Sequence, residues 1–181
     1  DFMKTVSYTN KKSLLDKLKV KSKREANIFF SLCEKDSEII STRRFKDVLL
    51  NSGLKAKDKR LYNLFQNLDA HGERIVFEDF INIIRSSELI VEKALRGELS
   101  IPDFSYFAKN LDNMFDEVKK IKSGELASYI PPLANVDPDQ FGVAIVTTDG
   151  QIYQRGDSEV DFSIQSMCKP FNYCFAMEKL G

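Results

Sequence analysis

The chain has 181 residues, a length that suits one large domain or two small ones. Apolar residues make up 43% of it, enough for a hydrophobic core, which argues against wholesale disorder. Lysine plus arginine number 27, as do aspartate plus glutamate, and this balance argues against a nucleic-acid-binding protein or one held by an acidic membrane.

The first 24 residues are predicted to be a basic leading segment. They hold few acids, and seven of their cations crowd residues 11–24, namely Lys11, Lys12, Lys17, Lys19, Lys21, Lys23 and Arg24. A basic amphipathic anchor is one interpretation of such a segment, and a solvated leader is the other. We favour the solvated leader.

Residues 25–98 have the pattern of a helical bundle. Ser22 to Glu25 form a capping box, and Ser52-Gly53 and Gly97 are typical helix stops. A further helix is expected from Ser87 to Arg96. Apolar side chains recur at helical spacing in four stripes, which are Ile28, Phe29, Phe30 and Leu32; Phe45, Val48 and Leu49; Leu61, Leu64, Phe65 and Leu68; and Phe80, Ile81, Ile83 and Ile84.

This helical region contains an internal repeat. Phe30, Cys33, Ile40, Phe45, Val48 and Leu49 recur thirty-five positions later as Phe65, Leu68, Ile75, Phe80, Ile83 and Ile84. Acidic residues, Glu34 and Asp69, open the two loops. A repeated helix–loop–helix unit with an isoleucine in the loop resembles a pair of EF-hands.

The loop spacing argues against calcium. A calcium loop needs alternating oxygen donors, a glycine at its sixth position and a bidentate glutamate at its twelfth. Here Ile40 and Ile75 follow the opening acids one position too early, so both loops are a residue short. Arg44 occupies the place of the closing acid in the first loop, while His71 takes a ligand place in the second and Arg74 adds opposing charge. We expect loops that have lost the metal.

Residues 99–181 are predicted to be a second, mixed region. Ser100 is expected to cap a long helix with Pro102 in its first turn, and Gly124 to end it beyond a basic last turn. An apolar strand from Phe141 to Thr147 follows, and Asp149-Gly150 predicts a two-residue hairpin turn. Helices, then a hairpin and a new helix, indicate an α+β fold.

The stretch S-I-Q-S-M-C-K-P-F places Ser166 three residues before Lys169. A serine nucleophile needs a base, and residues three apart are neighbours on a helix, so a partly neutral lysine could accept the hydroxyl proton. Pro170 is tolerated only where a helix has barely begun, because it lacks an N–H. We therefore expect Ser166 at a helix start, where the dipole favours developing negative charge.

Spacing alone leaves this assignment open. Ser52 and Lys55 also form S-x-x-K, at a helix stop with no sign of a pocket. The alternative for Ser166 and Lys169 is an N-cap serine beside an exposed lysine. Cys168 lies two positions from Ser166, which turns it away on a helix, so we expect a core thiol rather than a nucleophile.

The wider context is similar to the glutaminases. Gln165-Ser166-x-x-Lys169-Pro170 follows Gly156-Asp157 and Phe162 as in the nucleophile segment of that family. The likeness includes D-G-Q at 149–151, F-G-V at 141–143, Y-I-P-x-L-A at 129–134 and I-P-D-F at 101–104. The helical region resembles the EF-hand-like N-terminal domain of the animal kidney and liver enzymes. The resemblance covers most of the chain after about residue 25.

This resemblance implies hydrolysis of L-glutamine to L-glutamate and ammonia through a serine-linked γ-glutamyl ester. Ser166 would be the nucleophile and Lys169 its base, with the Ser166 N–H as half of the oxyanion hole. Gln165 and Tyr129 match positions that contact glutamine. The implied fold is α+β: an EF-hand-like helical bundle at 25–98, followed at 99–181 by the start of a serine β-lactamase/transpeptidase-like catalytic domain.

The resemblance also implies no metal or organic cofactor, phosphate as an activator, a homo-oligomer (dimer or tetramer) and a mitochondrial location, although no transit peptide lies in these residues. The scarcity of cysteine and histidine likewise disfavours a zinc site, a Ser-His-Asp triad and a Cys-His pair. No apolar run approaches the ~20 residues that span a bilayer.

The family's other substrate-binding residues and its second oxyanion amide lie downstream and cannot be placed here. A missing oxyanion donor alone costs ~10²–10³ in rate, so we expect these 181 residues to be inactive by themselves.

Two other classes stay open from the sequence. One is a penicillin-binding or β-lactamase-like S-x-x-K enzyme, whose S-x-N and K-T-G elements do not occur in these residues. The other is an EF-hand-like interaction module built on the helical repeat. Labelling by a β-lactam would favour the first, and a micromolar calcium heat signal would favour a calcium-sensing form of the second.

Overall fold

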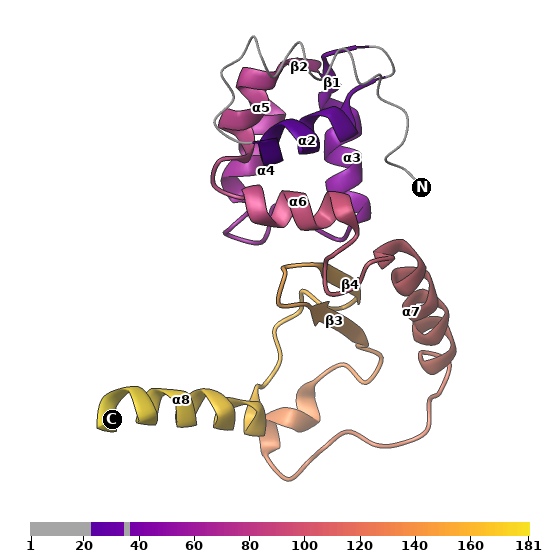
Figure 1. Cartoon of the computed structure of the whole chain (residues 1–181). Helices are drawn as coiled ribbons and strands as arrows, with labels where there is room; N and C mark the ends of the chain where they lie inside the picture. The colour runs from indigo at the N-terminus through magenta and orange to yellow at the C-terminus, as the bar shows by residue number, and fades with distance from the viewer. Residues whose placement is uncertain (1–22, 35–36) are drawn as a thin grey trace. The chain divides into compact units, whose positions relative to one another are not determined.

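A computed structural model describes residues 23–34 and 37–181 (Figure 1). The cations of the predicted leading segment and Ser22 of the predicted capping box lie outside what it describes, as do the side chains of Lys23 and Arg24. The chain divides into two compact units. The first comprises the residues up to Met114 together with Ala144–Tyr153, and the second comprises Phe115–Val143 with Gln154–Gly181.

Before α7 (Phe104–Val118), the described part of the first unit contains five short helices. They are α2 (Lys23–Leu32), α3 (Thr42–Asn51), α4 (Tyr62–Ala70), α5 (Phe77–Ile84) and α6 (Glu88–Arg96). The Ser41 side chain caps α3 by accepting the Arg44 N–H, and Gly97 ends α6 with a left-handed backbone (φ 66°). The four apolar stripes are confirmed as helices, and so is the helix that ends at Gly97.

Two short strands join the halves of the repeat. β1 (Ile40–Ser41) and β2 (Arg74–Ile75) pair antiparallel, with Ile40 opposite Ile75. These isoleucines are equivalent positions of the thirty-five-residue repeat. Pairing of equivalent residues across an antiparallel contact is what a local twofold arrangement of two helix–loop–helix units produces. The EF-hand-like arrangement inferred from the sequence is therefore present.

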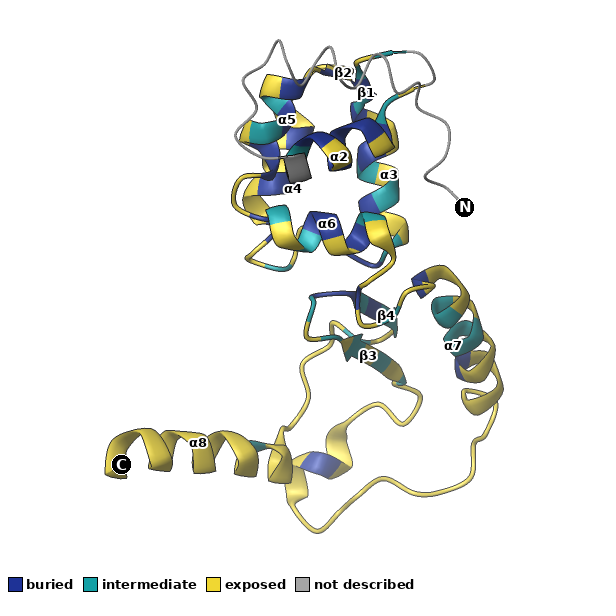
Figure 2. Ribbon diagram, viewed as in Figure 1, coloured by how far each residue is buried: buried dark blue, intermediate teal, exposed yellow. Residues whose placement is uncertain are grey.

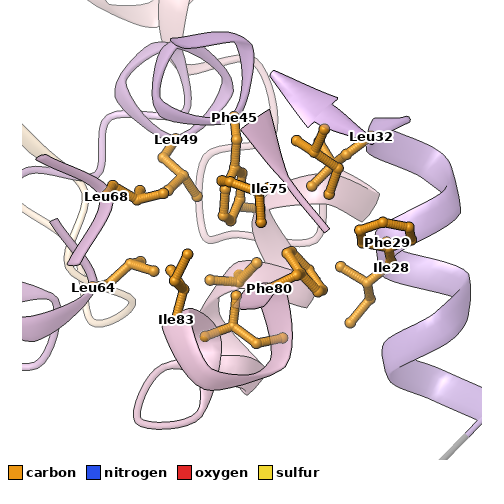
Figure 3. Close-up of a cluster of buried hydrophobic side chains, with 14 of the residues drawn as sticks. Ile28, Phe29, Leu32, Phe45, Leu49, Leu64, Leu68, Ile75, Phe80 and Ile83 are labelled. Atoms are coloured by element: carbon orange, nitrogen blue, oxygen red, sulfur yellow. The ribbon is translucent and has the colours of Figure 1, made fainter. Parts of the chain in front are cut away.

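The core of this unit is aromatic and closely packed (Figure 3). Phe29 contacts Phe80 with ring centroids 5.5 Å apart, and Phe80 contacts Phe45 at 5.6 Å. All three rings are fully buried. Figure 2 colours much of this bundle dark blue, the colour of buried residues. Phe45 and Phe80 are repeat-equivalent, so the duplicated pattern meets itself at the centre of the core.

The helix α7 (Phe104–Val118) begins later than the sequence predicted. Asp103 is its cap, because its side chain accepts the Tyr106 N–H at 2.9 Å. Ser100 was expected in that role and instead donates its hydroxyl to Asp149 at 2.9 Å. Because Ser100 bonds to Asp149 instead of capping α7, the helix begins at Phe104 and Pro102 precedes it.

The end of α7 also differs from the expectation. The N–H groups of Lys120 and Ile121 donate to carbonyls three residues back, at 3.2 and 3.0 Å, which closes the helix with a tight final turn. Lys119, Lys120 and Lys122 therefore lie beyond α7 rather than in its last turn, and Gly124 does not end it.

The predicted strands form a hairpin of β3 (Gly142–Val146) and β4 (Ile152–Gly156). Its turn has three residues between Thr147 and Gln151 rather than the predicted two. Thr147 donates its N–H to Gln151 O at 3.0 Å, and Gly150 donates to Thr147 O at 3.0 Å. Gly150 adopts φ 92°, so it supplies the left-handed position that closes a three-residue loop.

The second unit contains a small cluster around Phe115. The ring of Phe115 lies 4.8 Å from that of Phe141, and the Arg155 guanidinium lies 4.9 Å from its centroid. Arg155 also donates to Asp116 at 2.8 Å. Gly156 has no room for a side chain, because a Cβ there would lie 2.2 Å from Phe141 O. The Gly156-Asp157 turn thus packs directly against the strand that Phe141 precedes.

The remaining elements of the second unit are η1 (Pro131–Asn135), η2 (Gln165–Met167) and α8 (Cys168–Leu180). No residue of α8 is buried, as its yellow colour in Figure 2 shows. Leu133 in η1 is buried. Among the helices of residues 23–34 and 37–181, none combines the length and the apolar character needed to cross a bilayer.

Truncation of Phe80 tests the proposed core. We expect Phe80→Ala to lower the free energy of unfolding by about 3–5 kcal/mol, because a ring that contacts two others leaves a cavity. Urea unfolding followed by circular dichroism measures this loss. The control is Tyr62→Ala, whose side chain is 54% exposed and whose loss should cost less than about 0.5 kcal/mol. Equal losses in both variants would contradict the core assignment.

Candidate active site

Ser166 lies where extended chain turns into helix. The 3-10 turn η2 contains it, the Met167 N–H donates to Ile164 O at 3.0 Å, and α8 follows at once. Pro170 falls in the first turn of α8, where no intrahelical bond needs its missing N–H. The expectation that Ser166 lies at a helix start is confirmed.

The predicted nucleophile and base lie in consecutive elements, Ser166 in η2 and Lys169 at the start of α8. Ser166 and Lys169 are both exposed, and within the described residues no hydrogen bond joins the Ser166 hydroxyl to the Lys169 amine. Over the same residues, no acceptor takes the backbone N–H of Ser166. That N–H remains available to bind a negatively charged oxygen, as first-turn amides of helices can.

Tyr129 and Gln165 meet although 36 residues separate them in the chain. The Tyr129 hydroxyl donates to the side-chain oxygen of Gln165. Tyr129 is 73% exposed, so the pair lies on an open surface rather than in a closed pocket. The contact brings the two residues that the resemblance assigns to glutamine beside each other and next to Ser166.

The backbone of Gln165 is strained, which sequence reasoning did not predict. Its φ is 43°, the only positive value at a residue other than glycine in the described chain. Such a conformation costs about 1–3 kcal/mol and is found most often at functional sites. A glycine at this position would have suggested a positive φ from the sequence, whereas a glutamine does not.

The cysteines do not form a reactive pair. Burial raises the pKa of the Cys33 thiol to about 12, with the charge of Glu38 adding to the effect, so it stays protonated at neutral pH. Cys168 is half-buried and accepts a hydrogen bond from Asn172 at 3.6 Å, and Cys174 is exposed. The expected core position of Cys168 is not observed, because no residue of α8 is buried.

Comparison with known proteins bears directly on this segment. Residues 124–181 match the family model described as Glutaminase, and residues 24–102 match the model described as EF-hand domain. The glutaminase match covers less than half of the chain. It includes Ser166, Lys169, Tyr129 and Gln165, so all four predicted site residues lie within the matched range.

Individual proteins similar to this chain agree with the family match. The mitochondrial liver isoform of glutaminase from Rattus norvegicus is 31% identical over 160 residues, which are 85% of this chain and 26% of the rat protein. A glutaminase from a Nostoc strain is 43% identical over 90 residues, 50% of this chain and 27% of that protein. A Rhizobium etli glutaminase is 47% identical over 72 residues, 39% and 23% respectively. The chain thus spans about a quarter of the length of these curated relatives.

In the EF-hand-like unit, one of the two loop-opening acids is paired with a protein cation. Asp69, which opens the second loop, forms an ion pair with Lys46 of α3. His71 Nε2 lies 3.3 Å from an Asp79 oxygen, and the Thr42 hydroxyl donates to Gly72 O at 2.5 Å. Within the described residues no three acidic, histidine or cysteine side chains are placed to hold a metal ion.

A calcium titration tests the prediction that these loops have lost the metal. Isothermal calorimetry of the chain should give no binding heat at micromolar calcium, since Lys46 already neutralises Asp69 and both loops are short. Lys46→Met should leave the result unchanged, because freeing one carboxylate does not restore an oxygen cage. A saturable micromolar signal in either protein would contradict the prediction.

Proposed function

We propose that this protein hydrolyses the side-chain amide of L-glutamine to L-glutamate and ammonia, with Ser166 as nucleophile and Lys169 as base. The observation that carries the proposal is the position of both residues at the opening of α8, inside the range that matches the glutaminase family model. The relatives named glutaminase support the substrate.

The first half of the reaction forms an ester. The Ser166 hydroxyl oxygen attacks the amide carbon of glutamine while its proton passes to the neutral amine of Lys169. The carbonyl oxygen becomes an oxyanion, which the Ser166 N–H would bind at the start of the helix. The C–N bond then breaks, and Lys169 returns the proton to the nitrogen that leaves as ammonia.

The second half restores the enzyme. Water attacks the γ-glutamyl ester, giving its proton to Lys169, and the bond to the Ser166 oxygen breaks as the serine recovers a proton. Glutamate is released. Lysine suits this task because its amine can lose its charge in a desolvated site, whereas an arginine would stay protonated. A site closed around bound glutamine would supply that desolvation.

Tyr129 and Gln165 are proposed to bind the substrate. A phenolic hydroxyl and a carboxamide offer donors and acceptors that match the amide and the carboxylate of glutamine. They contact each other beside the nucleophile, so a substrate bound there would compete with, or add to, the existing hydrogen bond. This pairing places two polar groups within one short stretch of surface.

The same proposal includes the family's wider properties. We propose a serine β-lactamase/transpeptidase-like catalytic fold, a homo-oligomer (dimer or tetramer), activation by phosphate, and no metal or organic cofactor. We also propose a mitochondrial location, which is supported by the name of the rat relative, the mitochondrial liver isoform of glutaminase.

The isolated 181 residues are proposed to lack activity. Ser166, Lys169, Tyr129 and Gln165 are all exposed, so nothing among the described residues desolvates the lysine or encloses a substrate. A lysine base needs a desolvated site in order to lose its charge, and the described residues do not form one around Lys169. Catalysis then depends on further protein surface around α8.

Ammonia release from glutamine tests this assignment. In the protein as its source organism makes it, Ser166→Ala and Lys169→Ala should each lower kcat by about 10³-fold or more, because nucleophile and base act as one unit. The 181-residue chain should release no ammonia above the uncatalysed rate.

The matched control is Cys168→Ser, a change between the two site residues. It should leave kcat within about twofold, because the Cys168 thiol contacts Asn172 rather than the other site residues. Retained activity in Ser166→Ala, or labelling of Ser166 by a β-lactam without glutamine hydrolysis, would sink the proposal, the second result favouring a penicillin-binding type of enzyme.

A further inference from the structure

The D-G-Q motif at 149–151 does more than form a hairpin turn. Gln151 is fully buried, and every polar atom of its side chain is used. Its amide nitrogen donates to Ser52 O at 2.9 Å and to Ile101 O at 2.8 Å, and its oxygen accepts the Ile101 N–H at 2.9 Å. These partners belong to the loops after α3 and before α7. Within the hairpin, the Gln151 oxygen accepts one further, longer hydrogen bond of 3.4 Å from the Thr147 hydroxyl.

Asp149 contacts the helical bundle just as specifically. One carboxylate oxygen lies 2.9 Å from Lys93 Nζ on α6, and the other accepts both the N–H and the hydroxyl of Ser100 at 2.9 Å. The hydrogen bond from Lys93, followed by that from Ser100, lowers the pKa of Asp149. Because the folded pKa lies below the ordinary value of 3.8, this contact is present at neutral pH and is lost as the pH falls through the folded pKa.

Gly150 fits a site with no room for a side chain. A Cβ there would lie 2.1 Å from an Asp58 oxygen and 2.5 Å from Arg60 Nη2. Asp58 and Arg60 are held to each other at 2.6 Å, and Arg60 also donates to Thr148 O at 3.2 Å. The bundle therefore approaches the turn closely enough to exclude any larger residue at this position.

The backbone completes the contact. Leu54 forms an isolated antiparallel bridge with Gln151, and the Ile152 N–H donates to Gly53 O at 2.8 Å. A hairpin edge thus continues into the loop after α3, as strand addition does at exposed edges. Leu54 is fully buried, so this bridge is shielded from water.

We propose that Asp149-Gly150-Gln151 is a docking motif and that the helical bundle carries its receptor surface, formed by Gly53, Leu54, Asp58, Arg60, Lys93, Ser100 and Ile101. A three-residue hairpin loop needs only a left-handed residue at Gly150, and makes no demand on the side chains at 149 and 151. The receptor surface, in contrast, fits a carboxylate at position 149, a glycine at 150 and a carboxamide at 151.

This docking gives the helical bundle a partner of defined chemistry. The partner is the chain's own turn, which lies within the range matched by the glutaminase family model, whereas the EF-hand match ends at residue 102. The bundle would therefore hold a segment of the other family through recognition of its turn. The proposal does not rest on glutamine hydrolysis.

Amide hydrogen exchange of the 181-residue chain tests the docking. Gln151→Glu keeps the size of the side chain, replaces its two donors by an oxygen and sets a buried charge against two carbonyls. The amides of Ser100 and Ile152, which bond across the contact, should exchange about tenfold faster or more. The matched control is Gln140→Glu, an exposed glutamine, which should change neither rate.

An internal reference separates local from global opening. The Thr42 amide, which donates to Glu73 O at 3.0 Å beside β1 and β2, should keep its rate if only the docking is lost. If Gln151→Glu accelerates the exchange of the Ser100, Ile152 and Thr42 amides alike, the bundle has unfolded. The Lys93→Met variant then tests the docking instead. This substitution at a partly exposed side chain should make the Ile152 amide exchange severalfold faster, although Lys93 is remote in sequence from the hairpin.

The double variant Asp149→Asn with Lys93→Met completes a double-mutant cycle with the two single variants. Docking predicts that its effect on Ile152 exchange is smaller than the product of the single effects, because both variants break one ion pair. The proposal is overturned if Ser100 and Ile152 exchange no faster in Gln151→Glu than in Gln140→Glu. It is equally overturned if Lys93→Met leaves Ile152 unchanged after a global loss in Gln151→Glu.

Discussion

The requirement to satisfy a buried carboxamide fixes the place of the hairpin. Gln151 has no exposed surface, so each of its donors and acceptors must find a partner or cost about 1–3 kcal/mol. Apart from the Thr147 hydroxyl of the hairpin itself, the partners are main-chain groups of Ser52 and Ile101, at the two places where the chain leaves one helix and approaches another. One side chain thereby holds together a turn, a helix end and the approach to α7. The strands β3 and β4 extend from that fixed turn.

Much of the helical unit was predictable because its pattern is periodic and repeated. Equivalent apolar residues thirty-five positions apart indicated two similar units, and the pairing of Ile40 with Ile75 follows from that symmetry. The errors came from long-range competition. Ser100 has the sequence of a helix cap, but Asp149 takes its hydroxyl and its N–H, so Asp103 becomes the cap. No local pattern could have revealed an acceptor 49 positions away.

In the candidate site, too, some features were predictable from local sequence and others were not. Ser166 and Lys169 are placed by helix spacing, and the constraint from Pro170 correctly predicted a helix start at this point. The contact between Tyr129 and Gln165 crosses an irregular segment and a hairpin, so periodicity carries no information about it. The positive φ of Gln165 was equally hidden, because a strained glutamine has no sequence signature. These two features are also the ones that distinguish this turn from an ordinary capped helix.

The central functional claim is that Ser166 carries the γ-glutamyl group. Rapid acid quenching of the source organism's protein during turnover of glutamine, followed by peptide mapping with mass spectrometry, measures this directly. The account predicts a mass increase of one γ-glutamyl group on the peptide that contains Ser166, located to the serine by fragmentation and absent from Ser166→Ala. An adduct on Cys168, or continued hydrolysis without any adduct in a protein that carries Ser166→Ala, would contradict it.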